Sequence, residues 1–297
     1  MRARRAPLQI THDVTLFRFD LPSPSMALGL PVGKHVKIYA PNRTGVEAGN
    51  WCARPDPSHP VPSLAARGRS RLSCPRARRN GREDPEAEVG EIQRSYTPTS
   101  SEEDLGHLDL VIKVYKGGVI DRFPDGGKMS QYFDGLKVGD EVSLSGPVGM
   151  TEYVGAGKWL HGRREIKATH VGMMAGGTGI TPMYQILQVA LRDAKDKTKF
   201  SLIFANQTAD DILLKDEIDA LAAKYPSRFS VHYTLDRPPK KWSGSTGFIT
   251  PEMIQENLPA PKASTLVVMC GPPPMVKFAC KQNLDKLGYD KKLQLAF

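Results

Sequence analysis

The feature that most constrains the fold is an alternation of apolar strands and amphipathic helices, which begins near Ile166 and runs to the C-terminus. His170–Ala175 is an apolar run of strand length, and a glycine turn and a helix from Pro182 follow it. In that helix the apolar residues recur at the spacing of one helical face: Met183, Ile186, Leu187, Ala190 and Leu191. This pattern predicts a parallel sheet with right-handed crossovers.

The same alternation predicts the remaining elements of this half. We expect strands at Phe200–Ala205, Phe229–Leu235 and Thr265–Met269, and helices at Leu213–Lys224 and Met275–Leu287. Such a layout is typical of nucleotide-binding domains, but layout alone does not establish a function.

The N-terminal half has a different period. Short alternating stretches separated by Gly and Pro predict strands at Val14–Phe19, His35–Tyr39, Asp109–Tyr115 and Glu141–Ser145. Strands of this size suggest a small antiparallel β-barrel, with a short helix over Gly127–Phe133. We therefore predict two domains: a barrel over residues 1–150 and an α/β domain over 166–297, joined by a linker at 151–165.

Charge is concentrated in one segment. Of the net charge of +9, Cys52–Arg79 contributes +6, because it holds seven arginines and one acidic residue, Asp56. The segment has no helical or strand period and no aromatic residue, so we predict a disordered insert. An Arg-rich arm for nucleic acid or a membrane surface is the functional alternative, and a metal site at Cys52, Cys74 and His59 is disfavoured by its spacing.

Several classes of protein are excluded by simple counts. Hydrophobic residues make up 40% of the chain, but no apolar run approaches the roughly 18 residues that a membrane-spanning helix needs. The basic start has no apolar stretch behind it, so a secretory signal is not indicated. Four cysteines in 297 residues do not form a disulfide scaffold, and a reducing compartment is expected.

Two loops of the α/β half have compositions suited to an anionic ligand. Gly176–Pro182 (GGTGITP) lies between a strand and a helix, where glycines let backbone N–H groups approach a ligand. Thr181 is a natural N-cap with Pro182 at the first helical position, so a tight turn without a ligand is the alternative. Cys270–Met275 (CGPPPM) follows another strand, and the carboxyl ends of parallel strands share one edge of a sheet. Cys270 by itself is more often a buried small side chain than a reactive thiol.

A third motif lies in the barrel half. Arg94–Ser100 (RSYTPTS) places a guanidinium, an aromatic ring and hydroxyls within seven residues. Strand alternation sends Arg94 and Tyr96 to one face and Ser95 and Thr97 to the other. Arg can hold a diphosphate and Tyr can stack on a planar ring. A strand edge with a turn at Pro98 and no bound ligand is the alternative interpretation of this motif.

Taken in order, these motifs and Gly126–Ser130 (GGKMS) resemble the NADH–cytochrome b5 reductase family, within the ferredoxin–NADP reductase superfamily. The resemblance runs from about Ile10 to Phe297 and fails only across Cys52–Arg79. It implies an antiparallel β-barrel that binds FAD, followed by a parallel-sheet α/β domain that binds NADH.

The resemblance also implies roles for individual residues of the flavin site. Arg94 would hold the FAD diphosphate, Tyr96 would lie against the isoalloxazine, and Thr97 would sit near its reactive edge. The family often has Pro at Ser95. The other implied FAD-side residues are Val111, Lys113, Lys116, Gly127, Lys128, Met129, Ser130 and Thr181.

For NADH, the resemblance places Gly177, Thr178 and Gly179 around the diphosphate and Cys270 beside the nicotinamide. Gly271, Pro272 and Met275 complete that loop, and Phe297 matches a terminal aromatic near the flavin, which suggests a complete C-terminus. Asp236 resembles an acidic residue at the adenosine ribose; a carboxylate there repels a 2′-phosphate, so NADH is expected over NADPH. No side-chain acid–base pair and no metal is implied.

Electron transfer to cytochrome b5 is the implied activity, with Lys34 and Lys128 as basic groups that could steer this acidic partner or simply be solvated lysines. The alternatives are the reductase module of a nitrate reductase and, from another class, a non-enzymatic Arg-rich nucleic-acid-binding protein. We expect a monomer without a nucleic-acid partner. Arg2 stands where N-myristoylation needs glycine, so a cytoplasmic protein is expected, held at the endoplasmic reticulum or outer mitochondrial membrane only if an anchor is missing.

Overall fold

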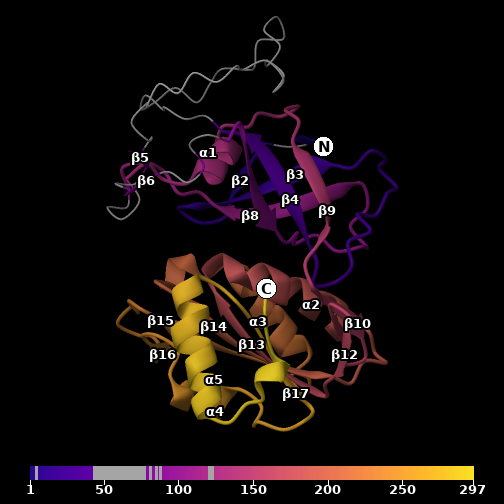
Figure 1. Cartoon of the computed structure of the whole chain (residues 1–297), viewed down its shortest axis with the longest axis vertical. Helices are drawn as coiled ribbons and strands as arrows, with labels where there is room; N and C mark the ends of the chain where they lie inside the picture. Colours follow the sequence, from indigo (N-terminus) through magenta and orange to yellow (C-terminus); the bar gives the residue numbers. More distant parts are fainter. Residues whose placement is uncertain (4–5, 43–77, 80–81, 84–85, 87–88, 120–123) are drawn as a thin grey trace, which may run out of the picture.

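The computed structural model describes residues 1–3, 6–42, 78–79, 82–83, 86, 89–119 and 124–297. These residues form an antiparallel half and a parallel-sheet half, which lie one above the other in Figure 1. The predicted insert Cys52–Arg79 lies outside the described residues except for β5 (Arg78–Arg79), which pairs with β6 (Arg82–Glu83).

The N-terminal half consists of two antiparallel sheets around one core. The first sheet contains β1 (Arg2–Ala3), β2 (Leu8–Gln9), β3 (Val14–Asp20) and β8 (His107–Lys113). The second has the order β7 (Glu91–Tyr96), β4 (His35–Pro41), β9 (Ser143–Val148). Alternate residues such as Phe17, Phe19 and Ile38 point from both sheets into this shared core, which is what a strand period of two requires. The predicted antiparallel domain is confirmed.

A short helix, α1 (Lys128–Asp134), covers one side of this core. Its Phe133 is fully buried, with ring centroids 5.3 Å from Phe17 and 5.4 Å from Tyr96. The helix therefore fixes the end of β7 through an edge-to-face aromatic contact.

The C-terminal half is built on a parallel sheet of six strands. Its order is β16 (Ser245–Thr246), β15 (Phe229–Leu235), β14 (Lys199–Asn206), β13 (His170–Gly176), β17 (Thr265–Cys270), β18 (Gln294–Ala296). The chain moves outward from β13 through β14 to β15, and then returns to β17 on the other side of β13. The point between β13 and β17 is the topological switch point, where open α/β sheets bind ligands.

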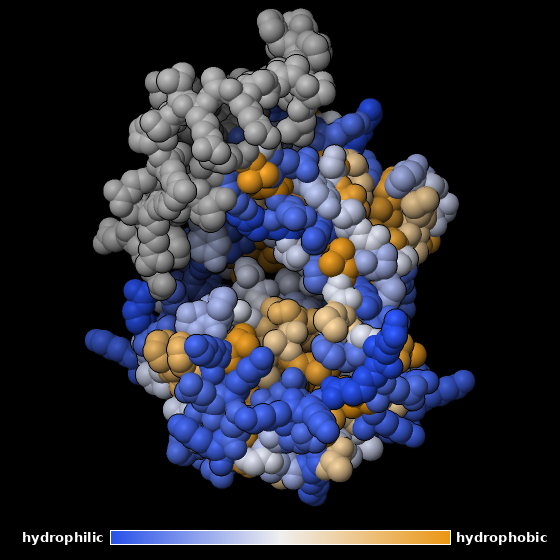
Figure 2. All heavy atoms as spheres, viewed as in Figure 1, coloured by the Kyte–Doolittle hydropathy of each residue, from blue (hydrophilic) through white to orange (hydrophobic). Residues whose placement is uncertain are grey.

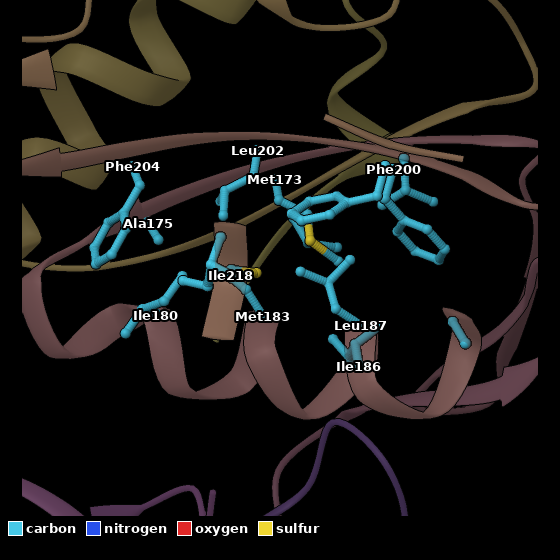
Figure 3. Packing of buried hydrophobic residues seen from close by; sticks show 14 of the residues in the cluster. Met173, Ala175, Ile180, Met183, Ile186, Leu187, Phe200, Leu202, Phe204 and Ile218 are labelled. Atoms are coloured by element: carbon cyan, nitrogen blue, oxygen red, sulfur yellow. The ribbon is translucent and has the colours of Figure 1, made fainter. Parts of the chain in front are cut away.

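Helices cover both faces of this sheet. Packed against one face are α2 (Ile180–Arg192) and α3 (Lys215–Lys224); against the other are α4 (Pro251–Asn257), the π-helix Met275–Lys281 and α5 (Gln282–Lys286). Figure 3 shows Met183, Ile186 and Leu187 of α2 pointing at the sheet, as the sequence spacing predicted. Met173 belongs to that core, whereas its neighbour Met174 belongs to the opposite one.

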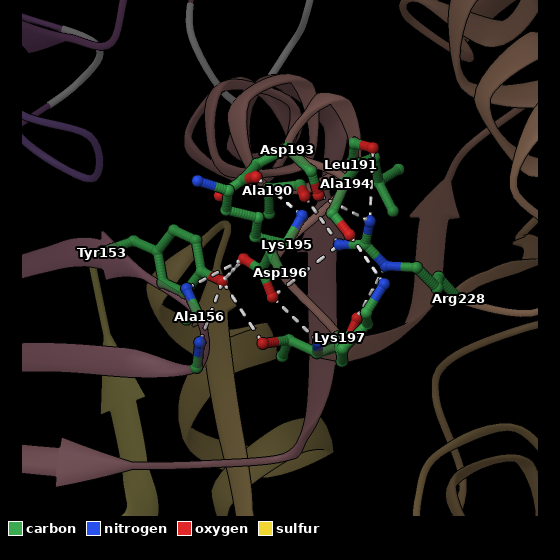
Figure 4. Close-up of polar contacts among 12 residues, drawn as sticks. Tyr153, Ala156, Ala190, Leu191, Asp193, Ala194, Lys195, Asp196, Lys197 and Arg228 are labelled. Atoms are coloured by element: carbon green, nitrogen blue, oxygen red, sulfur yellow. Dashed lines mark hydrogen bonds and ion pairs between the residues drawn. The ribbon is translucent and has the colours of Figure 1, made fainter.

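The segment expected to be a linker forms a small sheet instead. Strands β10 (Thr151–Gly155), β11 (Lys158–His161) and β12 (Arg164–Lys167) pair antiparallel. Tyr153 in β10 donates a hydrogen bond from its hydroxyl to the buried carboxylate of Asp196, which also accepts from Thr198 N at 2.8 Å (Figure 4). On the barrel side, Tyr153 N donates to Val32 O at 2.8 Å. Because Trp159 and Tyr153 are buried in the core of the α/β half, the segment is part of that folded half and not an extended linker between the domains.

Other elements differ in their ends. The predicted helix Met275–Leu287 is a π-helix followed by α5, and α3 begins two residues late because Leu214 has a positive φ of 54°. The predicted strand Glu141–Ser145 lies at Ser143–Val148, and Asp109–Tyr115 at His107–Lys113. Short 3-10 turns occur at Gly177–Gly179, Ala209–Asp211 and Lys291–Leu293. None of the helices that the structure describes is both long and apolar enough to cross a membrane.

Candidate functional site

The two glycine-containing loops of the α/β half meet at the switch point. In the register of the parallel pair, Ala175 of β13 lies beside Cys270 of β17, so the chain leaves both strands at the same edge. The loop after β13 is the 3-10 turn Gly177–Gly179, which leads directly into α2. The expected juxtaposition of the loops is therefore present.

Close packing between the loops explains why glycine is needed there. A Cβ at Gly179 would overlap the carbonyl oxygen of Cys270, and a Cβ at Gly176 would overlap the sulfur of Met275. Gly177 differs, because its φ is +53° and nothing lies within 4 Å of a Cβ built there. The loop thus packs tightly on its sheet side and leaves open space on its outer side, where a diphosphate could approach backbone N–H groups.

Thr181 does not cap the helix as the sequence suggested. Helix α2 begins at Ile180 with Gly179 as its N-cap, and the hydroxyl of Thr181 donates to Thr178 O at 3.2 Å. The preceding 3-10 turn shifts the helix start by two residues. Thr181 is 7% exposed, at the end of α2 nearest the loop.

Cys270 is a partly exposed free cysteine at this edge. Burial raises the pKa of its thiol to about 11, so the thiol stays protonated at neutral pH. That state suits a small neutral group that packs against a ring rather than a nucleophile.

In the antiparallel half, two of the expected FAD-side residues, Arg94 and Lys128, share one carboxylate. Arg94 pairs with Glu86 through two contacts of 2.7 and 2.9 Å, and Lys128 Nζ lies 3.5 Å from Glu86 Oε2. The hydrogen bonds from Arg94 hold the pKa of Glu86 below its usual range, against the opposing effect of burial. A carboxylate thus occupies the position beside both cations where a phosphate anion would bind.

Lys128 also corrects an expectation about the protein surface. The residue is 8% exposed, so its ammonium faces Glu86 instead of solvent and is not a surface charge for steering a partner. Lys34, the other lysine named for that role, is half-buried and donates to Gly149 O at 2.9 Å.

An open groove of about 290 Å³ lies beside Arg94. It is lined by Lys37, Gln93, Arg94 and Ser95, from strands β4 and β7. Tyr96 follows at the end of β7, where burial raises the pKa of its hydroxyl, and Thr97 is half-buried next to it. Figure 2 shows a hollow between the two halves on one face of the molecule.

Of the remaining residues that the sequence predicted near the flavin, some are buried in the cores and others lie at the surface. Val111 and Met129 are buried in the cores, and Lys116 is exposed with Asp134 3.8 Å away. Ser130 accepts a hydrogen bond from Tyr115 N at 3.1 Å, with its hydroxyl 3.3 Å from Gly127 O. Lys113 lies 2.7 Å from Asp13 and 3.1 Å from Asp211, and Asp211 belongs to the other half.

Asp236 follows β15 near the edge of the parallel sheet and is largely exposed. The part of its carboxyl that the protein covers loses solvation, which raises its pKa. The neighbouring Arg237 donates to Gln207 Oε1 at 2.9 Å, and its charge partly opposes the rise in the pKa of Asp236. Phe248, which follows β16, is 76% exposed. Sequence reasoning missed this ring, since only the structure shows a large aromatic left in solvent near the end of the strand beside β15.

The C-terminal residue lies at the domain boundary. Phe297 N donates to Met269 O at 3.0 Å, and its partly buried ring packs against the core below β17. In Figure 1 the C-terminus lies at the side of the α/β half that faces the antiparallel half. Pro272, in the loop after β17, is exposed.

Together, these features fit a dinucleotide on each side of the boundary. The antiparallel half offers a groove with cationic side chains for a diphosphate, and the α/β half offers open backbone space at Gly177. Gly126, with φ of +65°, lets the chain turn tightly into α1 beside Lys128.

Two family profiles match the chain. One, described as an oxidoreductase FAD-binding domain, matches residues 6–50 and 85–153. The other, described as an oxidoreductase NAD-binding domain, matches residues 173–281. The first match is interrupted across 51–84, which contains the predicted insert.

Relatives cover nearly the whole chain. It is 44% identical over 295 residues to NADH-cytochrome b5 reductase 2 of Xenopus laevis, spanning 97% of this chain and 84% of that protein. It is 43% identical over 294 residues to human NADH-cytochrome b5 reductase 1, spanning 97% of this chain and 82% of that protein. The crystal structure of the cytochrome b5 reductase domain of Ulva prolifera nitrate reductase aligns with a TM-score of 0.81 at 39% identity, covering 100% of this chain and 96% of that one.

Proposed function

Because the chain belongs to the NADH–cytochrome b5 reductase family, we propose that it oxidises NADH through FAD and passes single electrons to a cytochrome b5. When bound, FAD supplies the redox chemistry, taking up a hydride from NADH and releasing its electrons one at a time. The protein contributes binding, orientation and the electrostatic surroundings. The observation that carries the proposal is the presence of a cationic groove in the antiparallel half and an open glycine turn at the switch point of the α/β half.

In the flavin half, Arg94 and Lys128 would hold the diphosphate after exchanging Glu86 for it. Arg94 suits this role because its planar guanidinium can bond two oxygens at once, as it already does with Glu86. Tyr96 would lie against the isoalloxazine, its ring already fixed edge-on by Phe133.

In the nucleotide half, the backbone at Gly177–Gly179 would hold the NADH diphosphate and Asp236 would bond the adenosine ribose. Cys270, neutral at physiological pH, would pack beside the nicotinamide. The exposed ring of Phe248 supports an adenine position nearby, because a planar base can stack on it. The carboxylate of Asp236 favours NADH over NADPH.

Cytochrome b5 is proposed as the electron acceptor because the relatives are named NADH-cytochrome b5 reductases. The nitrate reductase domain supports a second candidate, in which the same module serves a larger haem protein. Both candidates share the NADH half-reaction and differ only in the acceptor. A cytoplasmic monomer remains part of the proposal, with attachment to the endoplasmic reticulum or the outer mitochondrial membrane only if the protein carries an anchor.

The test is a visible spectrum of the purified protein, followed by anaerobic NADH and then cytochrome b5. We expect a two-band flavin spectrum that bleaches with NADH and recovers as cytochrome b5 is reduced. A colourless protein that added FAD cannot reconstitute would contradict the proposal. Bleaching with NADH and turnover with ferricyanide, but none with cytochrome b5, would favour the second candidate. Removing residues 52–79 should leave these activities in place.

A further inference from the structure

An ion-pair cluster joins the two halves at the boundary. Lys113 Nζ, at the end of β8 in the antiparallel half, lies 3.1 Å from Asp211 Oδ1 in the α/β half. The same ammonium lies 2.7 Å from Asp13 Oδ2, next to the start of β3. The Lys113 and Asp211 side chains are only 20% and 11% exposed, so solvent screens this contact less than a surface pair.

We propose that Asp211 is a positioning residue for hydride transfer: it holds Lys113 across the boundary and thereby fixes the angle between the two domains. This inference rests on the proposed function, because it concerns how that function's two binding sites are aligned. Lys113 is one of the residues expected on the flavin side, so its placement bears directly on the site.

Asp211 is rigidly attached to its own domain. Its second oxygen, Oδ2, accepts from Thr208 N at 2.9 Å and from Thr208 Oγ1 at 2.7 Å. These bonds form a capping box around the 3-10 turn that follows β14, a central strand of the parallel sheet. Because Oδ2 is held there, Oδ1 is presented to Lys113 in one direction.

Lys113 is equally fixed on its side. In the register of β3 and β8 it pairs with Val14, and Asp13 precedes that residue. Val14 and Val111 pack into the apolar core of the α/β half, so the boundary next to the ion pair is apolar and closed. Burial disfavours the charged ammonium, but hydrogen bonds to both carboxylates outweigh it and raise the pKa of Lys113.

Other polar contacts across the boundary lie along one helix, α2. Along α2, Gln185 Oε1 accepts from Gly33 N at 2.7 Å, Gln188 donates to Thr99 O at 3.0 Å, and Arg192 pairs with Glu103 at 2.8 Å. These residues lie on one helix face, so their contacts follow a line along which the domains could hinge. The Lys113–Asp211 contact comes from different elements, β8 and the 3-10 turn after β14, and with the packing of Val14 and Val111 it attaches the two halves at a second place.

The charges of this cluster are balanced without a metal ion. The side chains of His12, Asp13 and Asp211 have potential ligand atoms within 4.8 Å of one another. The ammonium of Lys113 already lies between the two carboxylates and supplies the positive charge they need.

The experiment compares Asp211→Asn with Asp210→Asn in FAD-loaded protein. Asparagine at 211 can still accept from Thr208, so the turn is kept while the charge facing Lys113 is lost. Asp210 is exposed on the same turn and serves as the matched control. Stopped-flow absorbance at saturating NADH measures the rate of flavin bleaching, with NADH and with NADH deuterated at the transferred position.

We expect Asp211→Asn to slow bleaching by about 10-fold, since small misplacements of reacting groups are costly, and to change the deuterium isotope effect. The FAD content should stay at the wild-type value, and the control variant should bleach at the wild-type rate. A double variant with Lys113→Gln should be no slower than Lys113→Gln alone, because the two residues act through one contact.

Equal bleaching rates and isotope effects in wild type, Asp211→Asn and Asp210→Asn would overturn the inference while leaving the proposed function intact. A wild-type protein that NADH does not bleach would overturn the proposed function itself. If Asp211→Asn does not fold, Asp211→Ser, whose hydroxyl can also accept from Thr208, replaces it with the same expected outcomes.

Discussion

In the α/β half, the groups that face the predicted nucleotide site are backbone N–H groups at a glycine turn, whereas in the antiparallel half they are cationic side chains. The glycine turn is fixed by direct packing of Gly179 on Cys270, so its shape is set before a ligand arrives. The cations Arg94 and Lys128 are instead paired with Glu86 and must exchange partners. Binding in the first half should therefore depend on steric fit, and in the second on charge.

The largest effect should come from disturbing that steric fit. Gly179→Ala would place a Cβ against the Cys270 carbonyl and push the two loops apart. We expect NADH-driven flavin bleaching to fall by about 100-fold, because hydride transfer needs near contact, while FAD content stays unchanged. Gly90→Ala is the control, since nothing lies within 4 Å of a Cβ there. Unchanged stopped-flow bleaching in Gly179→Ala would show that the loop is not rigid.

In the antiparallel half, deleting a charge should weaken FAD binding, whereas the glycine variant of the α/β half should leave FAD binding unchanged. Arg94→Ala should weaken FAD binding by about 2 kcal/mol, roughly 30-fold in Kd, as expected for a lost charge-assisted bond. Titration of the stripped protein with FAD, followed by flavin fluorescence, measures this change. Arg2→Ala removes an exposed arginine paired with Glu141 in the same half and should leave the FAD Kd unaltered. If both variants bind FAD equally, the diphosphate lies elsewhere.

In the α/β half, we expect the charge of Asp236 to affect the preference between NADH and NADPH. Asp236→Ala removes the carboxylate expected to repel a 2′-phosphate, so the NADPH to NADH ratio of kcat/KM should rise by about 10-fold. Steady-state assays with ferricyanide as acceptor measure both cofactors. Asp210→Asn again provides a neutralised control. A ratio that does not move would place the adenosine ribose away from β15.

The smallest effect should come from the internal competitor of the flavin phosphate. Glu86→Gln removes the carboxylate that pairs with Arg94 and Lys128, so FAD should bind about 2-fold more tightly, as expected for a partly exposed ion pair worth roughly 0.5 kcal/mol. The FAD titration should show this gain shrinking at high salt. Glu91→Gln, an exposed acid at the start of β7, should not change it. Weaker FAD binding in Glu86→Gln would mean that Glu86 supports the site instead.

Local patterns in the sequence were sufficient for much of the fold. The apolar face of α2 follows from the spacing of Met183, Ile186 and Leu187, because a helix repeats every 3.6 residues wherever it lies. The meeting of the two glycine-containing loops follows from strand order, since parallel strands end at one edge. The small sheet β10–β12 escaped prediction because its short strands carry a weak period and are held by Tyr153 and Asp196, 43 residues apart.

Sequence alone determined the order of the FAD-binding and NAD-binding halves and the place of the glycine loop between a strand and a helix, because motifs and periods are local. Which charges face each other was decided only by the tertiary structure. Lys128 is buried against Glu86, and Lys113 is shared by Asp13 and Asp211. Coulomb interactions depend on distance in space and on burial, and neither can be read from separation along the chain.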